Sequence, residues 1–137
     1  MPMTFANVAA IIKKLPGVGI TTKWRNKTYV VGDKGFAWER PLSKADLARF
    51  GDETPPQGEI LAVRVDGLDG KDAVLAMAPA GFFTIPHFNG YAAVLIRIRD
   101  IGLLDRDELR DLVVDAWLTR AHKRVAKAWL NENERED

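Results

Sequence analysis

The segment from Phe82 to Tyr91 concentrates the side chains of this chain that could do chemistry or hold a ligand. It reads Phe-Phe-Thr-Ile-Pro-His-Phe-Asn-Gly-Tyr, which places three phenylalanines, one tyrosine and one histidine within ten residues. Aromatic side chains at this density require either a core or a partner surface. His87 can act as a general base or stack on a ligand, and the alternative is a structural, hydrogen-bonding histidine. The segment is therefore a candidate ligand-binding loop, for a small molecule or a protein, with His87 and Tyr91 as its contacts.

The sequence patterns of the common enzyme classes are absent from this chain. It has no cysteine, which excludes thiol nucleophiles, disulfides and cysteine-ligated metals, and its two histidines, His87 and His122, lie far apart. There is no GxSxG, no GxGxxG and no phosphate-binding loop that ends in Gly-Lys-Ser/Thr. The acidic residues fall mostly in first turns or on solvent faces of predicted helices, where helix electrostatics favours them. We therefore expect a non-enzymatic protein with no cofactor and no metal site.

Basic residues form the other candidate site. Residues 1–49 carry nine Lys/Arg against three Asp/Glu, an excess of +6 in a chain whose net charge is +1. Two groups have suggestive spacing, one along a predicted hairpin and one at helical intervals near the C-terminus: Lys23, Arg25, Lys27 and Lys34, and Arg120, Lys123, Arg124 and Lys127. The second group has the spacing of one helix face. Both groups are candidates for phosphate contacts, although ordinary solvent-exposed cations give the same pattern.

The elements that must position these residues follow from hydrophobic periodicity. Apolar residues from Phe5 to Leu15 recur at helical spacing, and Pro16-Gly17 ends that helix. Residues 18–40 alternate in the manner of three antiparallel strands, with predicted turns at Asn26-Lys27 and Gly32–Gly35. The fourth and fifth strands are predicted at residues 59–66 and 93–99.

Helices are predicted between and after these strands. Ser43 and Asp46 resemble a capping box that starts a short helix through Phe50. A second short helix is predicted to end near Ala78. Leu109 to Arg120 form a strongly amphipathic helix with Trp117 on its apolar stripe, and a break near Ala121-His122 precedes a last helix. Trp129 in that last helix is expected to be partly exposed.

The order of these elements predicts a two-layer α+β fold, with an antiparallel sheet of about five strands and helices packed on one face. We expect a single domain over residues 1–130 and a frayed acidic tail over residues 131–137. No apolar run approaches the roughly 20 residues that span a bilayer, and the N-terminus lacks the features of a signal peptide. We therefore expect a cytoplasmic protein without a membrane partner, and we favour a monomer.

An ordered set of motifs resembles the MmcQ/YjbR family of small bacterial proteins. The set consists of Phe82–Phe88 with Gly90-Tyr91 and Val94–Arg97, Leu15–Val18, Lys34–Ala37, Asp115–Trp117 and Lys123–Val125. The resemblance covers roughly residues 5 to 130. It departs from the family pattern at Lys34-Gly35, where the family has Gly-Lys, and at His122, where the family usually has proline. It implies a CyaY-like or secretion-chaperone-like two-layer fold with a "double wing" DNA-binding motif.

These observations lead to one functional prediction and one alternative. The prediction is a DNA-binding protein that contacts the phosphate backbone through the basic hairpin wings and the basic C-terminal helix face. Because no predicted recognition helix combines Arg with Asn or Gln, we expect little sequence selectivity. The alternative is a small-ligand or protein-binding module that uses the Phe82–Tyr91 loop.

Overall fold

The computed structural model describes residues 5–23, 25–53, 59–77, 82–98 and 106–133. In this part of the chain, six strands form one sheet in the order β1-β2-β3-β4-β6-β5, and every neighbouring pair is antiparallel. The strands are β1 (Val18–Lys23), β2 (Asn26–Val31), β3 (Lys34–Glu39), β4 (Ile60–Arg64), β5 (Phe82–Phe83) and β6 (Ala93–Arg97). The predicted α+β class and antiparallel meander are confirmed. The two-residue strand β5 at the sheet edge is an addition that the sequence did not suggest.

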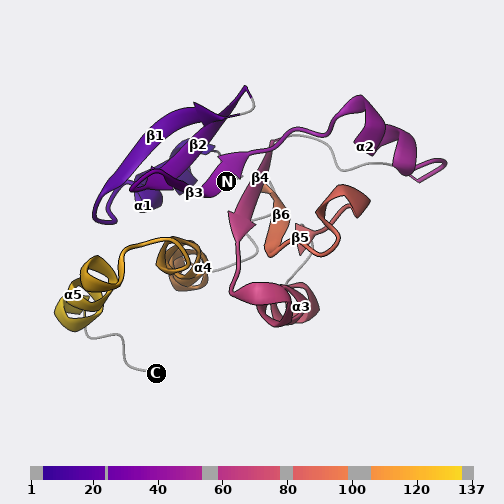
Figure 1. The fold of residues 1–137 in the computed structure, drawn as a ribbon. Helices are drawn as coiled ribbons and strands as arrows, with labels where there is room; N and C mark the ends of the chain where they lie inside the picture. Colours follow the sequence, from indigo (N-terminus) through magenta and orange to yellow (C-terminus); the bar gives the residue numbers. More distant parts are fainter. Residues whose placement is uncertain (1–4, 24, 54–58, 78–81, 99–105, 134–137) are drawn as a thin grey trace.

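Five α-helices and one 3₁₀ helix accompany the sheet in the described part of the chain (Figure 1). They are α1 (Phe5–Ile12), α2 (Lys44–Arg49), α3 (Gly67–Met77), η1 (Pro86–Phe88), α4 (Arg106–Leu118) and α5 (Lys123–Asn133). Since α5 continues to Asn133, the first three residues of the expected tail are helical, and residues 134–137 lie outside the described part. No helix among the described residues is both long enough and apolar enough to cross a membrane.

The main core lies between one face of the sheet and helices α1, α4 and α5, with α3 packed at its side. Strand residues that point to this face include Tyr29, Phe36, Leu61, Val63, Val94 and Ile96, and the helices contribute Val8, Ile12, Leu109, Val113 and Trp117. The Trp117 indole N–H donates to the Pro16 carbonyl at 3.1 Å, which ties α4 to the exit of α1. Trp129 is only 7% exposed and packs 5.8 Å from Trp117, so its expected partial exposure was wrong. Burial of the apolar face of α5 against α4 explains the difference.

A second, smaller cluster occupies part of the opposite face of the sheet. Its buried members are Ile60, Ala62, Ile85, Phe88, Ala93 and Leu95, with Trp38, Leu42, Phe50 and Phe83 packed against them. The alternation along β4 was predicted from the sequence and is confirmed, because Leu61 and Val63 point to the main core while Ile60 and Ala62 point away. The predicted two-layer arrangement is confirmed, because α1, α4 and α5 all pack on the main-core face. Helix η1 and the residues flanking α2 cover the β4–β6 part of the second face and leave its β1–β3 part open.

The register of the first hairpin differs from the prediction. Lys23 pairs directly with Asn26, so the strands connect between these two residues and not at Asn26-Lys27. Arg25 has a φ of +67°, which is unusual for a residue with a side chain and fits a tight two-residue connection. Directly paired residues share a face, so Lys23 lies on the face of Asn26 and Thr28, and Lys27 lies on the opposite face with Tyr29.

Candidate ligand-binding site

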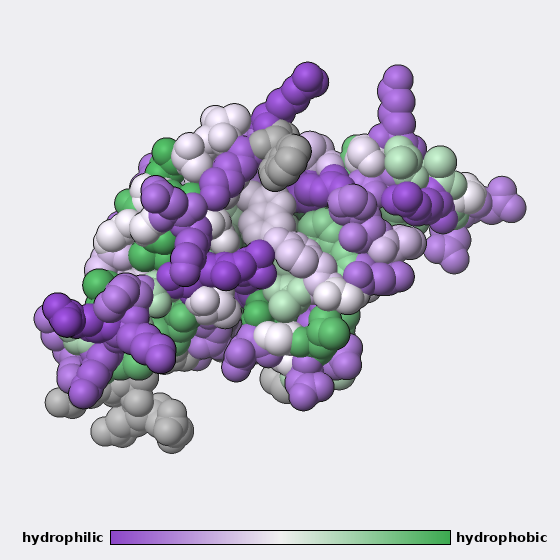
Figure 2. Space-filling view, viewed as in Figure 1, coloured by the Kyte–Doolittle hydropathy of each residue, from purple (hydrophilic) through white to green (hydrophobic). Residues whose placement is uncertain are grey.

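The open part of the second face contains a pocket of about 830 Å³, which we call the open-face pocket. Figure 2 shows this face hollowed near its centre, between the β1–β2 hairpin and α2, with hydrophilic residues along much of its border. The residues that line the pocket come from β1 to β4, from the start of α2 and from the η1 loop: Lys23, Asn26, Thr28, Gly35, Trp38, Arg40, Ser43, Arg64, His87, Phe88 and Tyr91.

Three aromatic rings form one wall of the open-face pocket. Phe88 is buried and meets Tyr91 edge-on, with ring centroids 5.5 Å apart and planes at 89°. Trp38 on β3 lies 6.4 Å from Phe88 and 6.3 Å from Tyr91, and its side chain is half-buried. Tyr91 is 37% exposed. Of the aromatic rings in the Phe82–Tyr91 segment, the buried Phe88 and the partly exposed Tyr91 line the pocket, whereas Phe82 and Phe83 do not.

A buried lysine holds the loop that carries this wall. Lys71 on α3 is 6% exposed, and its ammonium group donates to the carbonyls of Phe88 at 2.6 Å and Tyr91 at 2.9 Å. Burial lowers the pKa of Lys71 below its ordinary value of 10.5, and the nearby carboxylate of Asp72 partly opposes this shift. Sequence reasoning missed Lys71. The available signal was its place on the same helical stripe as Val74 and Leu75, where an apolar residue would be expected.

Two glycines shape the pocket. Gly90 has a φ of +76°, which lets the chain turn sharply after Asn89 and present Tyr91 to the pocket. At Gly35, an added Cβ would lie 3.0 Å from the Thr28 side chain across the β2–β3 pair. The absence of a side chain at Gly35 therefore leaves space in this part of the pocket.

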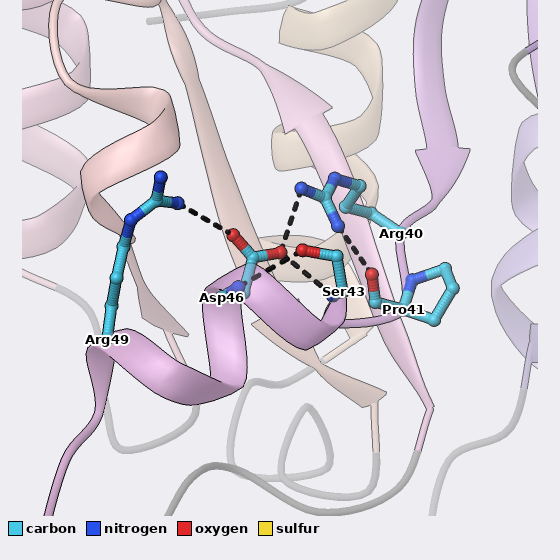
Figure 3. A network of polar contacts seen from close by, with 5 residues as sticks. All are labelled: Arg40, Pro41, Ser43, Asp46 and Arg49. Atoms are coloured by element: carbon cyan, nitrogen blue, oxygen red, sulfur yellow. Dashed lines mark hydrogen bonds and ion pairs between the residues drawn. The ribbon is translucent and has the colours of Figure 1, made fainter.

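Two of the cations that line the pocket, Lys23 and Arg40, already have protein partners. The Lys23 ammonium group donates to the Asp33 carbonyl at 2.9 Å. Arg40 forms an ion pair with Asp46 at 2.9 Å and donates to the Pro41 carbonyl (Figure 3). Their positive charge is therefore partly satisfied within the protein.

Asp46 is the centre of this network and confirms the predicted capping box of α2. The Ser43 hydroxyl accepts from the Asp46 N–H at 3.1 Å, and the Asp46 carboxylate accepts from the Ser43 N–H at 2.9 Å. Arg49 approaches the second carboxylate oxygen at 3.5 Å. Burial raises the pKa of Asp46, but Ser43 and Arg40 outweigh this effect and hold it below its ordinary value of 3.8. The carboxylate is thus a charged structural anchor that fixes Arg40 at the pocket.

Arg64 marks the opposite end of the pocket, toward the C-terminal end of β4. Its guanidinium group donates to the Tyr91 hydroxyl at 2.7 Å and lies 4.9 Å from the centre of the Tyr91 ring. Burial, and to a smaller extent the neighbouring charge of Arg120, lower its pKa, while Tyr91 acts in the opposite direction. No acidic residue is among the described residues that line the pocket. The pocket therefore combines aromatic surface with a positive potential.

The structure brings together only some of the residues singled out in the sequence. Lys23, His87 and Tyr91 all line the open-face pocket, although they come from opposite ends of the sheet. Lys27 lies on the other face, where its ammonium group is 5.6 Å from the Tyr29 ring. The interpretation that Lys23 and Lys27 share a face was therefore wrong, because across the hairpin Lys23 pairs with Asn26 whereas Lys27 pairs with Thr22, on the opposite face.

The remaining basic residues also fall in separate places. Lys34 pairs with Val31, which points to the main core, and Arg25 lies in the hairpin connection. Helix α4 ends at Leu118 and α5 begins at Lys123, so Arg120 is not on one helix face with the exposed Lys123, Arg124 and Lys127. The ring Nδ1 of His122 accepts the Arg124 N–H at 3.1 Å, which gives it a capping role at the start of α5.

The described residues do not assemble a metal centre, since no three or more of their histidine, aspartate and glutamate side chains are grouped in a way that could hold an ion. His87 is exposed on η1 and packs at 6.1 Å from Phe88. Its position at the pocket border suits contact with a ligand.

Comparison with known proteins places the chain in a family. Residues 13–119 match the family described as YjbR. The chain belongs to the YjbR family. It is 42% identical over 130 residues to "Uncharacterized protein Mb2600" of Mycobacterium bovis and "Uncharacterized protein Rv2570" of Mycobacterium tuberculosis, covering 93% of this chain and 95% of each relative. The crystal structure of the Deinococcus radiodurans protein DR2400, which has a domain named DUF419, aligns with a TM-score of 0.61 and 18% identity over 98% of this chain and 91% of that one. This structural likeness supports the shared fold of this family member.

Proposed function

We propose that this YjbR-family protein is a non-enzymatic binding module whose open-face pocket holds an anionic ligand with a planar ring. A mononucleotide and a nucleotide within a single-stranded nucleic acid share this chemistry. The observation that carries the proposal is the pairing of aromatic surface from Trp38, Phe88 and Tyr91 with cations from Lys23, Arg40 and Arg64 in one pocket.

Physical chemistry supports such a ligand. Stacking of a base on an aromatic side chain contributes about 1–3 kcal/mol and depends little on base identity. Charge-assisted hydrogen bonds from arginine or lysine to phosphate are roughly twice as strong as neutral ones. The volume of about 830 Å³ lies within the usual range of small-ligand sites.

Calorimetric titration of the protein with AMP, adenosine and a short oligo-dT tests the proposal. We expect AMP or the oligonucleotide to bind, and Trp38→Leu to weaken that binding because it removes one of the aromatic rings that line the pocket. Lys127→Ala, on the exposed surface of α5, is the matched control and should bind as the unaltered protein does. If no nucleotide or oligonucleotide binds, or if Trp38→Leu binds normally with its fold intact, the proposal is wrong.

Duplex DNA binding is the second candidate. It is favoured by one observation: Lys27 and Lys34 lie on the face of the sheet that also carries α5, with its exposed Lys123, Arg124 and Lys127. Lys23 points to the other face and is not part of this candidate surface. Four phosphate contacts would give a log–log salt slope of roughly −4 on duplex DNA, at about −0.9 per contact.

A titration against duplex DNA at several salt concentrations separates the two candidates. If duplex DNA is the ligand, the double variant Lys123→Ala/Arg124→Ala should lower the salt slope by up to about two units, and Trp38→Leu should leave it unchanged. If the protein instead binds single-stranded DNA, and only Trp38→Leu weakens that binding, the result supports the open-face pocket as the binding site.

A further inference from the structure

Arg64 and Tyr91 form a pair of hydrogen-bond donors at the open-face pocket. Both side chains line the pocket, Arg64 from β4 and Tyr91 from the loop after η1. The Arg64 guanidinium group donates to the Tyr91 hydroxyl at 2.7 Å and lies 4.9 Å from the centre of that ring. Because the hydroxyl oxygen accepts from Arg64, its own hydrogen is directed elsewhere, and no acceptor for it is found among the described residues. A guanidinium group and a hydroxyl group that donate side by side are suited to an oxygen anion.

Arg64 is the arginine of this pocket that the protein compensates least. Its one hydrogen-bond partner in the described part of the chain is the neutral Tyr91 hydroxyl, and its buried Nε–H has no acceptor there. By contrast, Arg40 is paired with the Asp46 carboxylate. Buried donors without acceptors are uncommon in native proteins. An incoming anion therefore meets a guanidinium group that still lacks a charged partner.

The register of the sheet places this donor pair beside Trp38. Trp38 on β3 pairs with Ala62 on β4, and Arg64 lies two residues further along β4, on the same face as Ala62. Diagonal neighbours of this kind are about 7–8 Å apart. The Tyr91 ring lies 6.3 Å from the Trp38 ring. A ligand ring that stacks on Trp38 can therefore have its anionic group within reach of Arg64 and Tyr91.

Resting on the function proposed above, we propose that Arg64 and Tyr91 bind an internal phosphodiester of a single-stranded nucleic acid, with the adjoining base on Trp38. One cation and one neutral donor match the single negative charge of a phosphodiester, whereas the second charge of a terminal phosphate has no cation of its own in this donor pair. The β1–β3 part of the sheet face is open, which leaves room for neighbouring nucleotides. The ligand class is therefore a single strand and not a free mononucleotide.

Removal of the charge from one phosphate tests the inference on the unaltered protein. The probes are the dinucleotide TpT, which has a single phosphodiester, and its analogue with an uncharged methylphosphonate in that position. We expect calorimetric titration to show that TpT binds about 10- to 100-fold more tightly, the effect of one or two charge-assisted hydrogen bonds. Equal affinity of the two dinucleotides would overturn the inference.

Three variants assign the contact to its side chains. Arg64→Gln should remove most of the preference for TpT and leave the affinity for the methylphosphonate analogue unchanged. Tyr91→Phe keeps the ring and removes only the hydroxyl donor, so it should reduce the preference by about 3- to 10-fold. Lys23→Gln removes another cation that lines the pocket and is the matched control, with a preference close to that of the unaltered protein. The backbone amide NMR spectrum checks that each variant is folded.

The outcomes distinguish this inference from the function on which it rests. If Lys23→Gln removes the preference and Arg64→Gln retains it, the phosphate lies elsewhere in the pocket, and this inference is overturned while the proposed function stands. If dTMP binds more tightly than TpT, the pocket selects a terminal phosphate and the choice of a single strand is wrong. If AMP, TpT and oligo-dT all fail to bind, the proposed function fails and this inference fails with it.

Discussion

The two faces of the sheet are built from the same strands but end in different environments. On one face, residues such as Leu61 and Val63 are sealed under α1, α4 and α5. On the other face, Ile60 and Ala62 are covered only by the η1 loop and its neighbours, and the sheet beyond them is open over β1 to β3. The first face is a closed, packed core, whereas the second carries charged and aromatic residues that line the open-face pocket. The difference shows that coverage by helices, not strand pattern, decides which face is a closed core and which stays open.

Truncation of one aromatic residue on each face should give the largest difference in unfolding free energy between the two faces. Trp117→Ala removes a fully buried ring and its hydrogen bond to Pro16, and should cost about 3–5 kcal/mol of unfolding free energy. Phe83→Ala on the second face removes a half-buried ring and should cost only about 1–2 kcal/mol. Urea unfolding of both variants measures the difference. Equal losses would mean that the second face is a core of the same kind as the first.

Lys71 provides the next test, because it does not line the pocket but donates hydrogen bonds to the loop that contains Phe88 and Tyr91. Lys71→Met retains the apolar stem but leaves the carbonyls of Phe88 and Tyr91 without this donor, which should cost about 1–3 kcal/mol. Lys44→Met, at an exposed site on α2, is the control.

The same lysine should also give a pH dependence. Its pKa is lower in the folded protein, so the unfolded chain binds more protons between the lowered pKa and the ordinary value of 10.5. The unfolding free energy of the unaltered protein should therefore rise relative to Lys71→Met as the pH rises through that interval. A relative fall, measured by urea titrations along the pH series, would contradict the assigned cause.

Asp46 fixes Arg40 and the start of α2 at the edge of the open face, and its substitution should have a smaller effect on stability. Asp46→Asn keeps the shape but removes the charge that holds Arg40, and should cost about 1–2 kcal/mol at neutral pH, in the upper range of helix-cap substitutions. Because the folded pKa of Asp46 lies below 3.8, its stabilisation is present above that value and is lost as the pH falls through the folded pKa. Thermal melts should show the two proteins converging in acid, and Asp52→Asn, at an exposed site, should show no such trend.

Arg25 lies between the two faces, in the hairpin connection, and should give the smallest change. Its φ of +67° is costly for a residue with a Cβ, so Arg25→Gly should stabilise the protein by up to about 1 kcal/mol. Arg25→Ala keeps the Cβ and should leave the melting temperature almost unchanged. A destabilised glycine variant would show that the arginine side chain itself supports the hairpin.

Local patterns in the sequence determined the elements of this protein. The alternation of Leu61 and Val63 against Ile60 and Ala62, the Ser43–Asp46 cap and the stripe through Trp117 were all predictable, because each depends on residues within one strand or helix turn. Family motifs along the chain agreed with the same antiparallel fold. These features require only short-range geometry, with a period of 2 in strands and 3.6 in helices.

Tertiary structure alone decided the binding surface. The buried position of Lys71 and the hydrogen bond of Arg64 to Tyr91 depend on contacts between residues distant in the sequence. The cross-strand pairing of Lys23 with Asn26 and of Lys27 with Thr22, invisible to composition, placed these two cations on opposite faces. The sequence therefore determined which strands and helices form, while their packing determined which side chains line the open-face pocket, because electrostatic and hydrogen-bond partners are set by distance in space.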